Sequence, residues 1–390
     1  MRKYVCAHCH KVHTTEEKVD EYKCGASDRE VYDFNNSDEY LKREAPIVEK
    51  ERKELGLDGL VGGLDSVIIN TEISRHTAAT REILERTGFR LAQSFDEPAF
   101  QTHILKLDGS PSLIIRCRQD NKNPFTPFNM APKARHLPNT RLETFVFRTS
   151  DIDEYFRIQK ERGVNFMTGG ILEFDNYRFI QTIPSPYIGC SIGLIDWTGD
   201  LGDYKGNLAD LSQDGLDKPE TDFLGNIGYL DHTATRVRAR DRDAAIIEFI
   251  ELTNYHFDFA IYVENLNSIT SVARLSADDF AMVFTSGITP FIDSENSGPT
   301  EKYTANYGTR THHMAFATEE IDATYTELKK AGVEFLIDLI GSPEDGLKQT
   351  FTEQSSNTLL VNEYIHRFGE FDGFFTRSNV TGLTKATEKQ

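Results

Sequence analysis

The stretch TRTHHMAFATEEID at residues 309–322 decides the fold, because it repeats TRLETFVFRTSDID at residues 140–153. The offset between the two is 169 residues (309 minus 140). Both stretches begin with the alternation typical of a strand and continue into a helix. The same offset relates GVNF at 163–166 to GVEF at 332–335, where a glycine follows the helix. The chain therefore contains an internal duplication.

An upstream unit is duplicated as well. GLDS at residues 63–66 matches YLDH at residues 229–232, with an offset of 166 residues (229 minus 63). Each unit is predicted to form a strand, a helix and further strands, which gives four βαβββ-like modules in two pairs. Paired modules of this kind close a sheet around a cavity. We therefore expect an α+β fold of tandem βαβββ modules with two barrel-like domains.

Positions at which the two copies differ in chemical type point to a site in one of them. At three positions the second copy carries a potential metal ligand that the first copy lacks. They are His232 in place of Ser66, His313 in place of Thr144 and Glu363 in place of Leu194. Two imidazoles and a carboxylate on one face of an octahedral ion leave three positions open, which is typical of Fe(II) oxygenases, although zinc and manganese accept the same ligand types.

The adjacent residues His312 and His313 present a choice of ligand. Successive residues of a strand point to opposite faces of the sheet, so we expect only one of the two side chains to enter the cavity. Periodicity does not choose between them. The same alternation directs His366, three residues after Glu363, to the opposite face, so Glu363 is the favoured carboxylate ligand.

Five short motifs surround these candidates. They are DH at 231–232, HMAF at 313–316, LKQTFT at 347–352, NEYIHR at 362–367, and GF at 373–374 followed by Asn379. With these motifs the chain resembles 4-hydroxyphenylpyruvate dioxygenase and its relatives in the vicinal oxygen chelate (glyoxalase-like) superfamily, over roughly residues 62–383. In that family the second ligand histidine precedes a hydrophobic-Ala-hydrophobic triplet, which favours His313 over His312.

The resemblance implies an Fe(II)-dependent dioxygenase of 2-oxo acids. In the family, the 2-oxo acid chelates the iron, dioxygen takes a third position, and oxidative decarboxylation is coupled to hydroxylation of the same substrate. The implied iron ligands are His232, His313 and Glu363. The implied catalytic residues, which also contact substrate, are Gln349 and Phe351. Further candidate substrate contacts are Ser268, Phe374 and Phe375, before a terminal helix that caps the pocket.

The chain differs from the family in the segments whose side chains hydrogen-bond the phenol hydroxyl of the family's substrate. The family's Pro-x-Asn-Glu-Pro strand is here TSGITP at 285–290, and the glutamines expected within residues 298–307 are missing. A pocket that binds a phenol needs polar groups that hydrogen-bond the hydroxyl. Such groups make the pocket specific, because a substrate without the hydroxyl would leave them buried and unpaired. The substrate is expected to be 4-hydroxyphenylpyruvate or a related aryl or alkyl 2-oxo acid.

Two alternative functions remain open. The 50 residues between His313 and Glu363 (363 minus 313) resemble the spacing in extradiol catechol dioxygenases, which favours ring cleavage of a catechol. The other alternative is a non-catalytic chelate-fold protein that binds a small molecule. The three retained ligands weigh against it.

Three of the five cysteines lie near the N-terminus and resemble part of a zinc ribbon. Ser27 stands where the fourth cysteine is expected. The candidate zinc ligands are Cys6, Cys9, Cys24 and His10, with His13 or Asp28 as alternatives to His10. The odd number of cysteines speaks against a disulfide framework, so we expect structural zinc or free thiols.

The charged linker that follows is predicted to be helical over residues 37–56. Ser37 is the expected N-cap, Pro46 is expected to break the helix, and Gly56 is expected to end it. The expected segments are a zinc-ribbon-like segment at 1–30, the linker at 31–60, a first chelate-fold domain without metal at 61–205 and a catalytic chelate-fold domain at 222–390.

The chain of 390 residues carries 62 acidic and 43 basic residues, a formal charge of −19. This charge speaks against nucleic acid or an anionic membrane as a partner. No run approaches the ~18 apolar residues of a membrane span, and the N-terminus lacks the apolar core of a signal peptide. We expect a cytoplasmic homo-oligomer whose partners are a small-molecule 2-oxo acid and dioxygen.

Overall fold

The computed structural model describes residues 34–120, 122–211, 215–369, 371 and 373–390, together with the backbone of residues 2–5 and 12–15. The two N-terminal strands, β1 (Arg2–Val5) and β2 (Val12–Thr15), pair antiparallel. The candidate zinc ligands Cys6, Cys9, His10 and Cys24 lie outside the described residues, so the zinc site stays a prediction.

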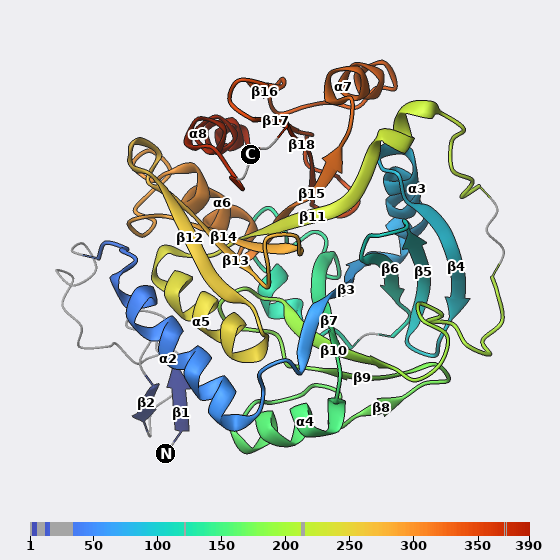
Figure 1. Cartoon of the computed structure of the whole chain (residues 1–390), viewed down its shortest axis with the longest axis vertical. Coiled ribbons are helices and arrows are strands. Elements are labelled where there is room, and N and C mark those ends of the chain that lie inside the picture. Colours follow the sequence, from blue (N-terminus) through green and yellow to red (C-terminus); the bar gives the residue numbers. More distant parts are fainter. Residues whose placement is uncertain are drawn as a thin grey trace.

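Two eight-stranded sheets form the body of the molecule (Figure 1). The first sheet holds β3 (Val61–Thr71), β4 (Arg90–Asp96), β5 (Phe100–Lys106), β6 (Ser112–Arg118), β7 (Arg141–Thr149), β8 (Leu172–Glu173), β9 (Tyr177–Gln181) and β10 (Ser191–Trp197). The second sheet holds β11 (Ile227–Arg236), β12 (His256–Val263), β13 (Ser268–Arg274), β14 (Ala281–Ser286), β15 (Arg310–Thr318), β16 (Ile340–Ser342), β17 (Leu347–Phe351) and β18 (Val361–Arg367). We call them the first and second half.

Each half contains two modules in which a helix follows the first strand. The module helices are α3 (His76–Arg86), α4 (Ile152–Glu161), α5 (Arg242–Leu252) and α7 (Ile321–Lys330). Strand order is β4-β5-β6-β3-β7-β10-β9-β8 in the first sheet and β12-β13-β14-β11-β15-β18-β17-β16 in the second. The two orders are equivalent, so the expected α+β fold of tandem βαβββ modules is confirmed.

The remaining helices lie outside the modules. They are α2 (Glu39–Leu55), α6 (Pro299–Tyr307) and α8 (Arg377–Ala386). Short 3-10 turns are η2 (Ile73–Arg75), η3 (Thr126–Asn129), η4 (Asp222–Asn226), η5 (Ala239–Asp241), η6 (Glu264–Leu266) and η7 (Thr387–Lys389).

Local sequence explains how the module helices form. In α4, the Asp151 side chain accepts a hydrogen bond from the Glu154 backbone N–H at 3.0 Å, which caps the first turn. Ile152, Tyr155 and Ile158 recur at helical spacing and are all buried. The helix therefore buries one apolar face.

The first strands of the two modules meet in the centre of each sheet. β3 pairs antiparallel with β7, and β11 pairs antiparallel with β15. Parallel neighbours flank these pairs, β6 and β10 in the first half and β14 and β18 in the second. The sheets curl because strands twist, and residues that alternate inward line the concave face.

The two halves are joined by reciprocal contacts of equivalent residues. Arg310 Nη2 donates to the Thr140 carbonyl at 2.7 Å, and Arg141 Nη2 donates to the Thr309 carbonyl. These residues are related by the 169-residue offset (310 minus 141). Each arginine therefore pairs with the backbone of the other half, as an approximate two-fold relation requires.

Equivalent aromatic side chains also pack across the interface. The ring centroids of Phe89 and Phe316 lie 6.0 Å apart, and those of Tyr255 and Phe147 lie 5.3 Å apart. Gly88, next to Phe89, allows this approach, because a Cβ there would lie 2.1 Å from the Ile227 carbonyl oxygen. The two halves thus share one apolar core.

The linker helix α2 differs from its prediction in two respects. Its N-cap is Asp38 rather than Ser37, and its backbone continues through Pro46 without a break. The helix continues because its buried side chains Leu41, Ala45 and Val48 pack in the core. Gly56 ends the helix in the left-handed conformation, as predicted.

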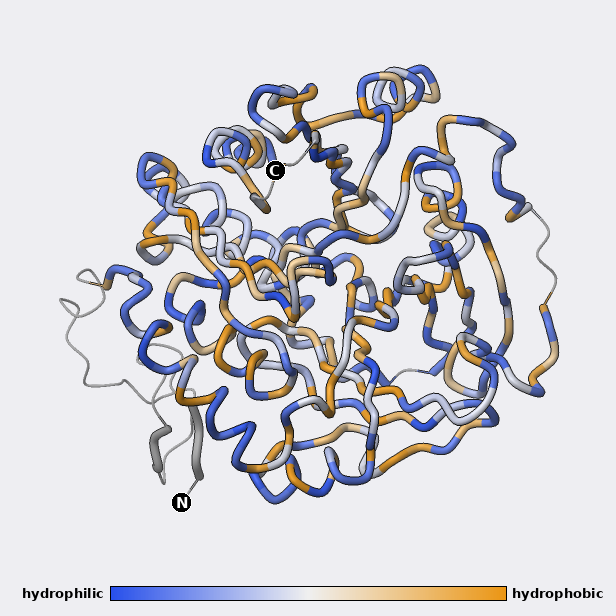
Figure 2. Tube along the Cα trace, viewed as in Figure 1, coloured by the Kyte–Doolittle hydropathy of each residue, from blue (hydrophilic) through white to orange (hydrophobic). Residues whose placement is uncertain are grey.

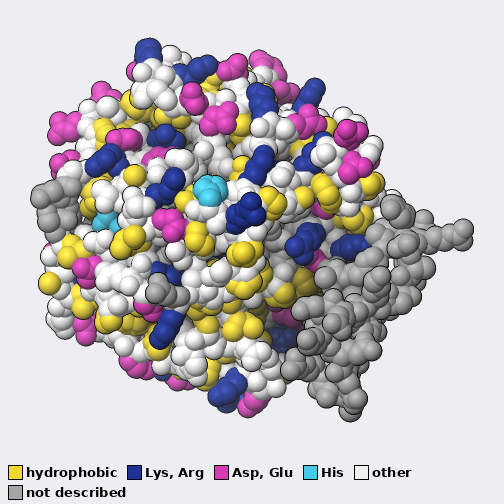
Figure 3. All heavy atoms as spheres, turned by 180° about the vertical axis from the view of Figure 1, so that it is seen from behind, with side chains coloured by type: hydrophobic (Ala, Val, Ile, Leu, Met, Phe, Trp, Pro, Cys, Tyr) yellow, Lys and Arg dark blue, Asp and Glu magenta, His cyan; other side chains and the backbone are white. Residues whose placement is uncertain are grey.

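Helix α2 lies beside α5, and its chain is mostly hydrophilic (Figures 1 and 2). On the face seen from behind, acidic and basic side chains are mixed (Figure 3). Among the helices of the described ranges, none combines the length and apolar character that a membrane crossing needs.

Candidate metal centre

Three neighbouring strands of the second half carry the candidate ligands. His232 lies on β11, His313 on β15 and Glu363 on β18, and these strands are adjacent in that order. Ala315 on β15 pairs with His232 on one side and with Glu363 on the other. The small side chain of Ala315 leaves room between the two ligands.

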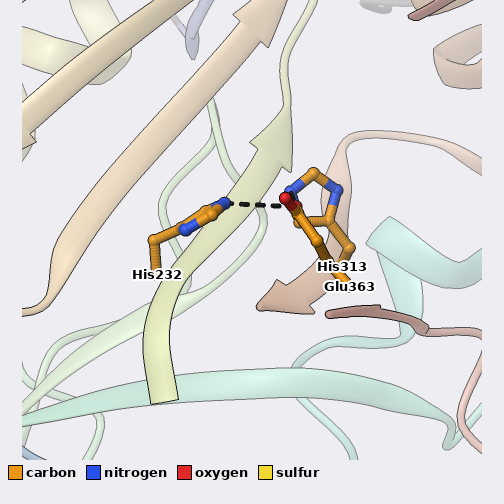
Figure 4. A group of neighbouring side chains, drawn as sticks. All are labelled: His232, His313 and Glu363. Carbon is orange, nitrogen blue, oxygen red and sulfur yellow. Dashed lines mark ion pairs between the residues drawn. The ribbon is translucent and has the colours of Figure 1, made fainter. Parts of the chain in front are cut away.

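One carboxylate oxygen lies close to both imidazoles. Glu363 Oε2 is 3.3 Å from His232 Nε2 and 3.2 Å from His313 Nε2. The three side chains are buried, point toward one another (Figure 4) and offer ligand atoms that all lie within 4.8 Å. Two donors at about 2.1 Å from an octahedral ion lie about 3 Å apart. The spacing therefore suits one ion held by all three side chains.

Two atoms of this group have no hydrogen-bond partner in the part of the chain that the structure describes. They are His232 Nε2 and Glu363 Oε1, both buried. Buried polar atoms are nearly always paired, because an unpaired one costs about 1–3 kcal/mol. A divalent ion would satisfy both atoms, so the residues fit a metal.

His232 is held from behind by Asp231 and Arg367. Asp231 Oδ1 lies 2.7 Å from His232 Nδ1, and both Nη atoms of Arg367 donate to the Asp231 carboxylate, at 2.6 and 3.1 Å. Burial raises the pKa of Asp231, but hydrogen bonds from His232 and Arg367 outweigh burial and hold it well below its usual range. An ionised Asp231 orients the imidazole so that Nε2 faces the site.

The carboxylates around His232 favour positive charge at the centre. Burial lowers the pKa of His232, but Glu363 and Asp231 outweigh burial and raise it to about 9. The negative charges of Glu363 and Asp231 also attract a metal cation that coordinates His232 Nε2.

Of the adjacent residues His312 and His313 on β15, only His313 lines the cavity, as expected. His313 pairs with Ala234, whereas Thr311 pairs with the next residue of β11, so His312 is an extra residue that forms a bulge. The two imidazoles touch, with their Nδ1 atoms 2.9 Å apart. The bulge redirects the side chains of this strand, so that the two imidazoles touch although only one of them lines the cavity. The distance of 3.2 Å between His313 Nε2 and Glu363 Oε2 also distinguishes His313.

Strand register corrects one counterpart in the first half. Val146, the counterpart of Ala315, pairs with Gly193, just as Ala315 pairs with Glu363. Gly193 rather than Leu194 is therefore the counterpart of Glu363, because the second half has one additional residue before β18. A shift of one residue moves a side chain to the opposite face. The first half still lacks a ligand there.

The concave face of the first half is filled by side chains. Asp65, the counterpart of Asp231, accepts hydrogen bonds from Tyr204 Oη at 2.7 Å and from Trp197 Nε1 at 3.0 Å. Both aromatic side chains pack in an apolar cluster with Ile68 and neighbouring residues of the concave face. In the first half, packed aromatic and aliphatic side chains therefore lie where the second half has its candidate metal centre.

A cavity lies beside the candidate ligands in the second half, and three expected substrate contacts line it. They are Gln349, Phe351 and Phe375. Both amide atoms of Gln349 are buried without a hydrogen-bond partner among the described residues, so they are free to bind a ligand. The Phe351 ring centroid lies 4.7 Å from that of His313.

The other two expected contacts lie behind the lining. Phe374 packs against His232, with ring centroids 5.4 Å apart, and Arg367 Cζ lies 4.8 Å from its ring. Ser268 Oγ lies 3.2 Å from Thr300 Oγ1, and Thr300 lines the cavity. Phe374 and Ser268 therefore contact residues of the site, His232 and Thr300, from outside the cavity.

Five further polar residues line the cavity and lie outside the expected set. They are Arg236, Thr270, Thr285, Thr300 and Thr384. Arg236 has a signal in the sequence, because its counterpart at the 166-residue offset (236 minus 166) is Asn70. The threonines have no such signal, because threonine is common on strands such as those of Thr270 and Thr285, and Thr300 and Thr384 lie on helices without any distinguishing motif. Helix α8 also lines the cavity, through Val380, Leu383 and Thr384.

No family model matches this chain, and no curated protein matches its sequence. Its structure is similar to a triple mutant of 4-hydroxymandelate synthase from Streptomyces coelicolor, with a TM-score of 0.62 and 15% identity over 85% of this chain and 99% of that chain. It is also similar to a xylose isomerase-like TIM barrel/4-hydroxyphenylpyruvate dioxygenase fusion protein, with a TM-score of 0.60 and 14% identity over 88% of this chain and 57% of that chain. The chain therefore shares the fold of these proteins, built here from tandem βαβββ modules.

Proposed function

We propose that this chain is an Fe(II)-dependent dioxygenase that oxidatively decarboxylates a 2-oxo acid and hydroxylates the same substrate. One observation carries the proposal. Glu363 Oε2 lies 3.2–3.3 Å from the Nε2 atoms of His232 and His313, and its second oxygen is buried and unpaired. The fold shared with 4-hydroxymandelate synthase and with the 4-hydroxyphenylpyruvate dioxygenase fusion protein supports this class of reaction.

The ligand set favours iron over a structural metal. Three protein ligands on one side of an octahedral ion leave three positions for substrate and dioxygen. When bound, Fe(II) would supply the redox chemistry and gather the two reactants at one centre. His232, His313 and Glu363 would hold it, and Asp231 would keep His232 in the metal-binding orientation.

The cavity residues bind substrate and exclude water. Gln349 offers an unpaired amide donor and acceptor next to the ligands. Phe351 packs against His313, and the Phe375 ring centroid lies 5.1 Å from that of His232. These rings form apolar walls that exclude bulk water from the reacting groups.

The test is turnover of 2-oxo acids by protein reconstituted anaerobically with Fe(II). We expect dioxygen uptake and carbon dioxide release in equal amounts from at least one aryl or alkyl 2-oxo acid, and no turnover by His313→Ala. A yellow ring-fission product from catechols, without turnover of any 2-oxo acid, would support the extradiol alternative instead. Absence of bound iron after reconstitution would point to a non-catalytic binding protein.

A further inference from the structure

A buried cation lines the cavity beside the candidate metal centre. Arg236, the last residue of β11, is 4% exposed and lines the cavity. Its Nη1 donates to Thr300 Oγ1 at 3.0 Å, and its Cζ lies 5.0 Å from the centroid of the Tyr303 ring. Its Nε has no hydrogen-bond partner, and no carboxylate neutralises it within the described part of the chain.

A buried guanidinium without a counter-charge is unusual, because buried charges are normally paired. Burial lowers the pKa of Arg236 to about 10, so this side chain stays charged at neutral pH. An anion that enters the cavity would supply the missing partner.

The fold itself does not require an arginine at this position. Asn70 holds the corresponding place on β3 and donates to the Asn139 carbonyl at 2.7 Å. By contrast, Arg141 and Arg310 occur in both halves and donate to backbone carbonyls across the interface. The charge of Arg236 is therefore specific to the half that carries the candidate ligands.

Arg236 stands in a row of hydrogen-bond donors. Thr285 on β14 pairs with Arg236, and Thr270 on β13 pairs with Thr285. All three line the cavity, and Thr285 Oγ1 is buried without a partner among the described residues. A guanidinium and neighbouring hydroxyls can donate together to one carboxylate.

The wall between this row and the candidate ligands is apolar. Ala234 and Val283 pair with each other, two residues before Arg236 and Thr285, and both line the cavity. His313 and Glu363 line the other end. The cavity therefore has a chelating end, an apolar middle and a cationic end.

We propose that the substrate is a 2-oxo acid with a second carboxylate at its far end, and that Arg236 binds this carboxylate. The inference rests on the proposed function, since the 2-oxo acid end must face the candidate metal ligands. It also accounts for the absence of phenol-reading groups, because Thr285 belongs to the stretch TSGITP at 285–290 that replaces the family's asparagine-containing strand.

Calorimetry under nitrogen with the Fe(II)-loaded protein tests the inference with two matched pairs of acids. The pairs are 2-oxoadipate with 2-oxohexanoate, and 4-carboxyphenylpyruvate with phenylpyruvate. Iron content is measured separately. We expect the dicarboxylate of at least one pair to bind about 10- to 100-fold more tightly than its monocarboxylate partner, as a charge-assisted hydrogen bond provides.

The variants assign the preference to one side chain. In Arg236→Gln the ratio of the two affinities should fall close to one, and Arg236→Lys should keep part of it. Arg238→Gln is the matched control, because the Arg238 side chain is 60% exposed and should leave the ratio as it is.

Equal affinity for both acids of each pair in the wild-type protein would overturn the inference and leave the proposed function standing. Equal weakening of both acids in Arg236→Gln would also overturn it, because Arg236 would then bind the shared 2-oxo acid end. Binding of neither acid to iron-loaded protein would refute the proposed function itself. The wild-type comparison holds even where a variant does not fold.

Discussion

At the scale of single residues, the candidate centre depends on how each imidazole is held. His232 directs Nδ1 to Asp231, and His313 directs Nδ1 to His312 at 2.9 Å. His312 in turn places Nε2 at 2.8 Å from Gln390 Oε1. Burial lowers the pKa of both His312 and His313 well below its usual value, so both rings are neutral. An Nδ1–H on His313 then donates to His312, which leaves His313 Nε2 free to bind metal.

This arrangement predicts different consequences for the two adjacent histidines. His313→Ala should abolish iron binding, because it removes a ligand. His312→Ala should keep stoichiometric iron with an affinity about 10- to 100-fold lower, because it removes only the partner that orients His313. Metal analysis and anaerobic Fe(II) titration of both variants provide the measurement. Equal loss in the two variants would refute the assignment of His313.

The duplication supplies a matched control for Asp231. Asp231→Asn should weaken iron binding about 10- to 100-fold, because His232 loses the carboxylate that orients it. The equivalent change Asp65→Asn leaves a single acceptor oxygen where Tyr204 and Trp197 now donate to one oxygen each. It should lower thermal stability without changing iron affinity. Reduced iron affinity in Asp65→Asn would contradict the assignment of the site to the second half.

At the scale of elements, packing overrides local breaking signals. Helix α2 continues through Pro46 although proline removes a backbone donor and is unfavourable inside a helix. Asp38 caps no backbone N–H, since its carboxylate accepts hydrogen bonds from Arg242 and from Tyr262 at 2.5 and 2.6 Å. Tertiary contacts therefore decide where this helix begins and that it stays whole.

Pro46→Ala should raise the free energy of unfolding by about 1–3 kcal/mol, because it restores a helical hydrogen bond at an exposed position. Urea denaturation monitored by circular dichroism measures the change. Lys50→Ala, at another exposed position of α2, is the control and should change stability by less than about 0.5 kcal/mol. A lower free energy of unfolding in Pro46→Ala would show instead that contacts of the proline ring stabilise the folded protein.

At the scale of the whole molecule, the two halves are similar in fold and different in content. The first half fills its concave face with an apolar cluster, and the second keeps a cavity with a candidate metal centre. Both halves contribute to the interface through equivalent residues. The first half, which lacks the candidate ligands, therefore supports the second half through the packing of their interface.

The interface contains a carboxyl group that should make stability depend on pH. Glu248 on α5 accepts a hydrogen bond from Ser185 of the first half, and burial raises its pKa to about 7. Because the folded-state pKa lies above the unfolded value of 4.5, its stabilising contribution is present below pH 4.5 and is lost as pH rises through 7.

Glu248→Gln should remove this dependence. Between pH 5 and pH 8 the wild-type protein should lose roughly 1–3 kcal/mol more of its unfolding free energy than the variant does. Denaturant titrations of both proteins at the two pH values provide the comparison. The same pH dependence in both proteins would show that Glu248 is already ionised at pH 5 in the folded protein.

The sequence by itself determined the duplication, the module pattern and the three candidate ligands, because repeats, periodicity and residue type can all be recognised in the sequence without knowledge of contacts between strands. Tertiary structure decided what depends on strand pairing. It replaced Leu194 with Gly193 as the counterpart of Glu363, and it placed a bulge at His312, so that the two adjacent imidazoles touch while only His313 lines the cavity. It also aligned Arg236 with Thr285. Register and bulges are set by contacts between distant strands, so local sequence does not encode them.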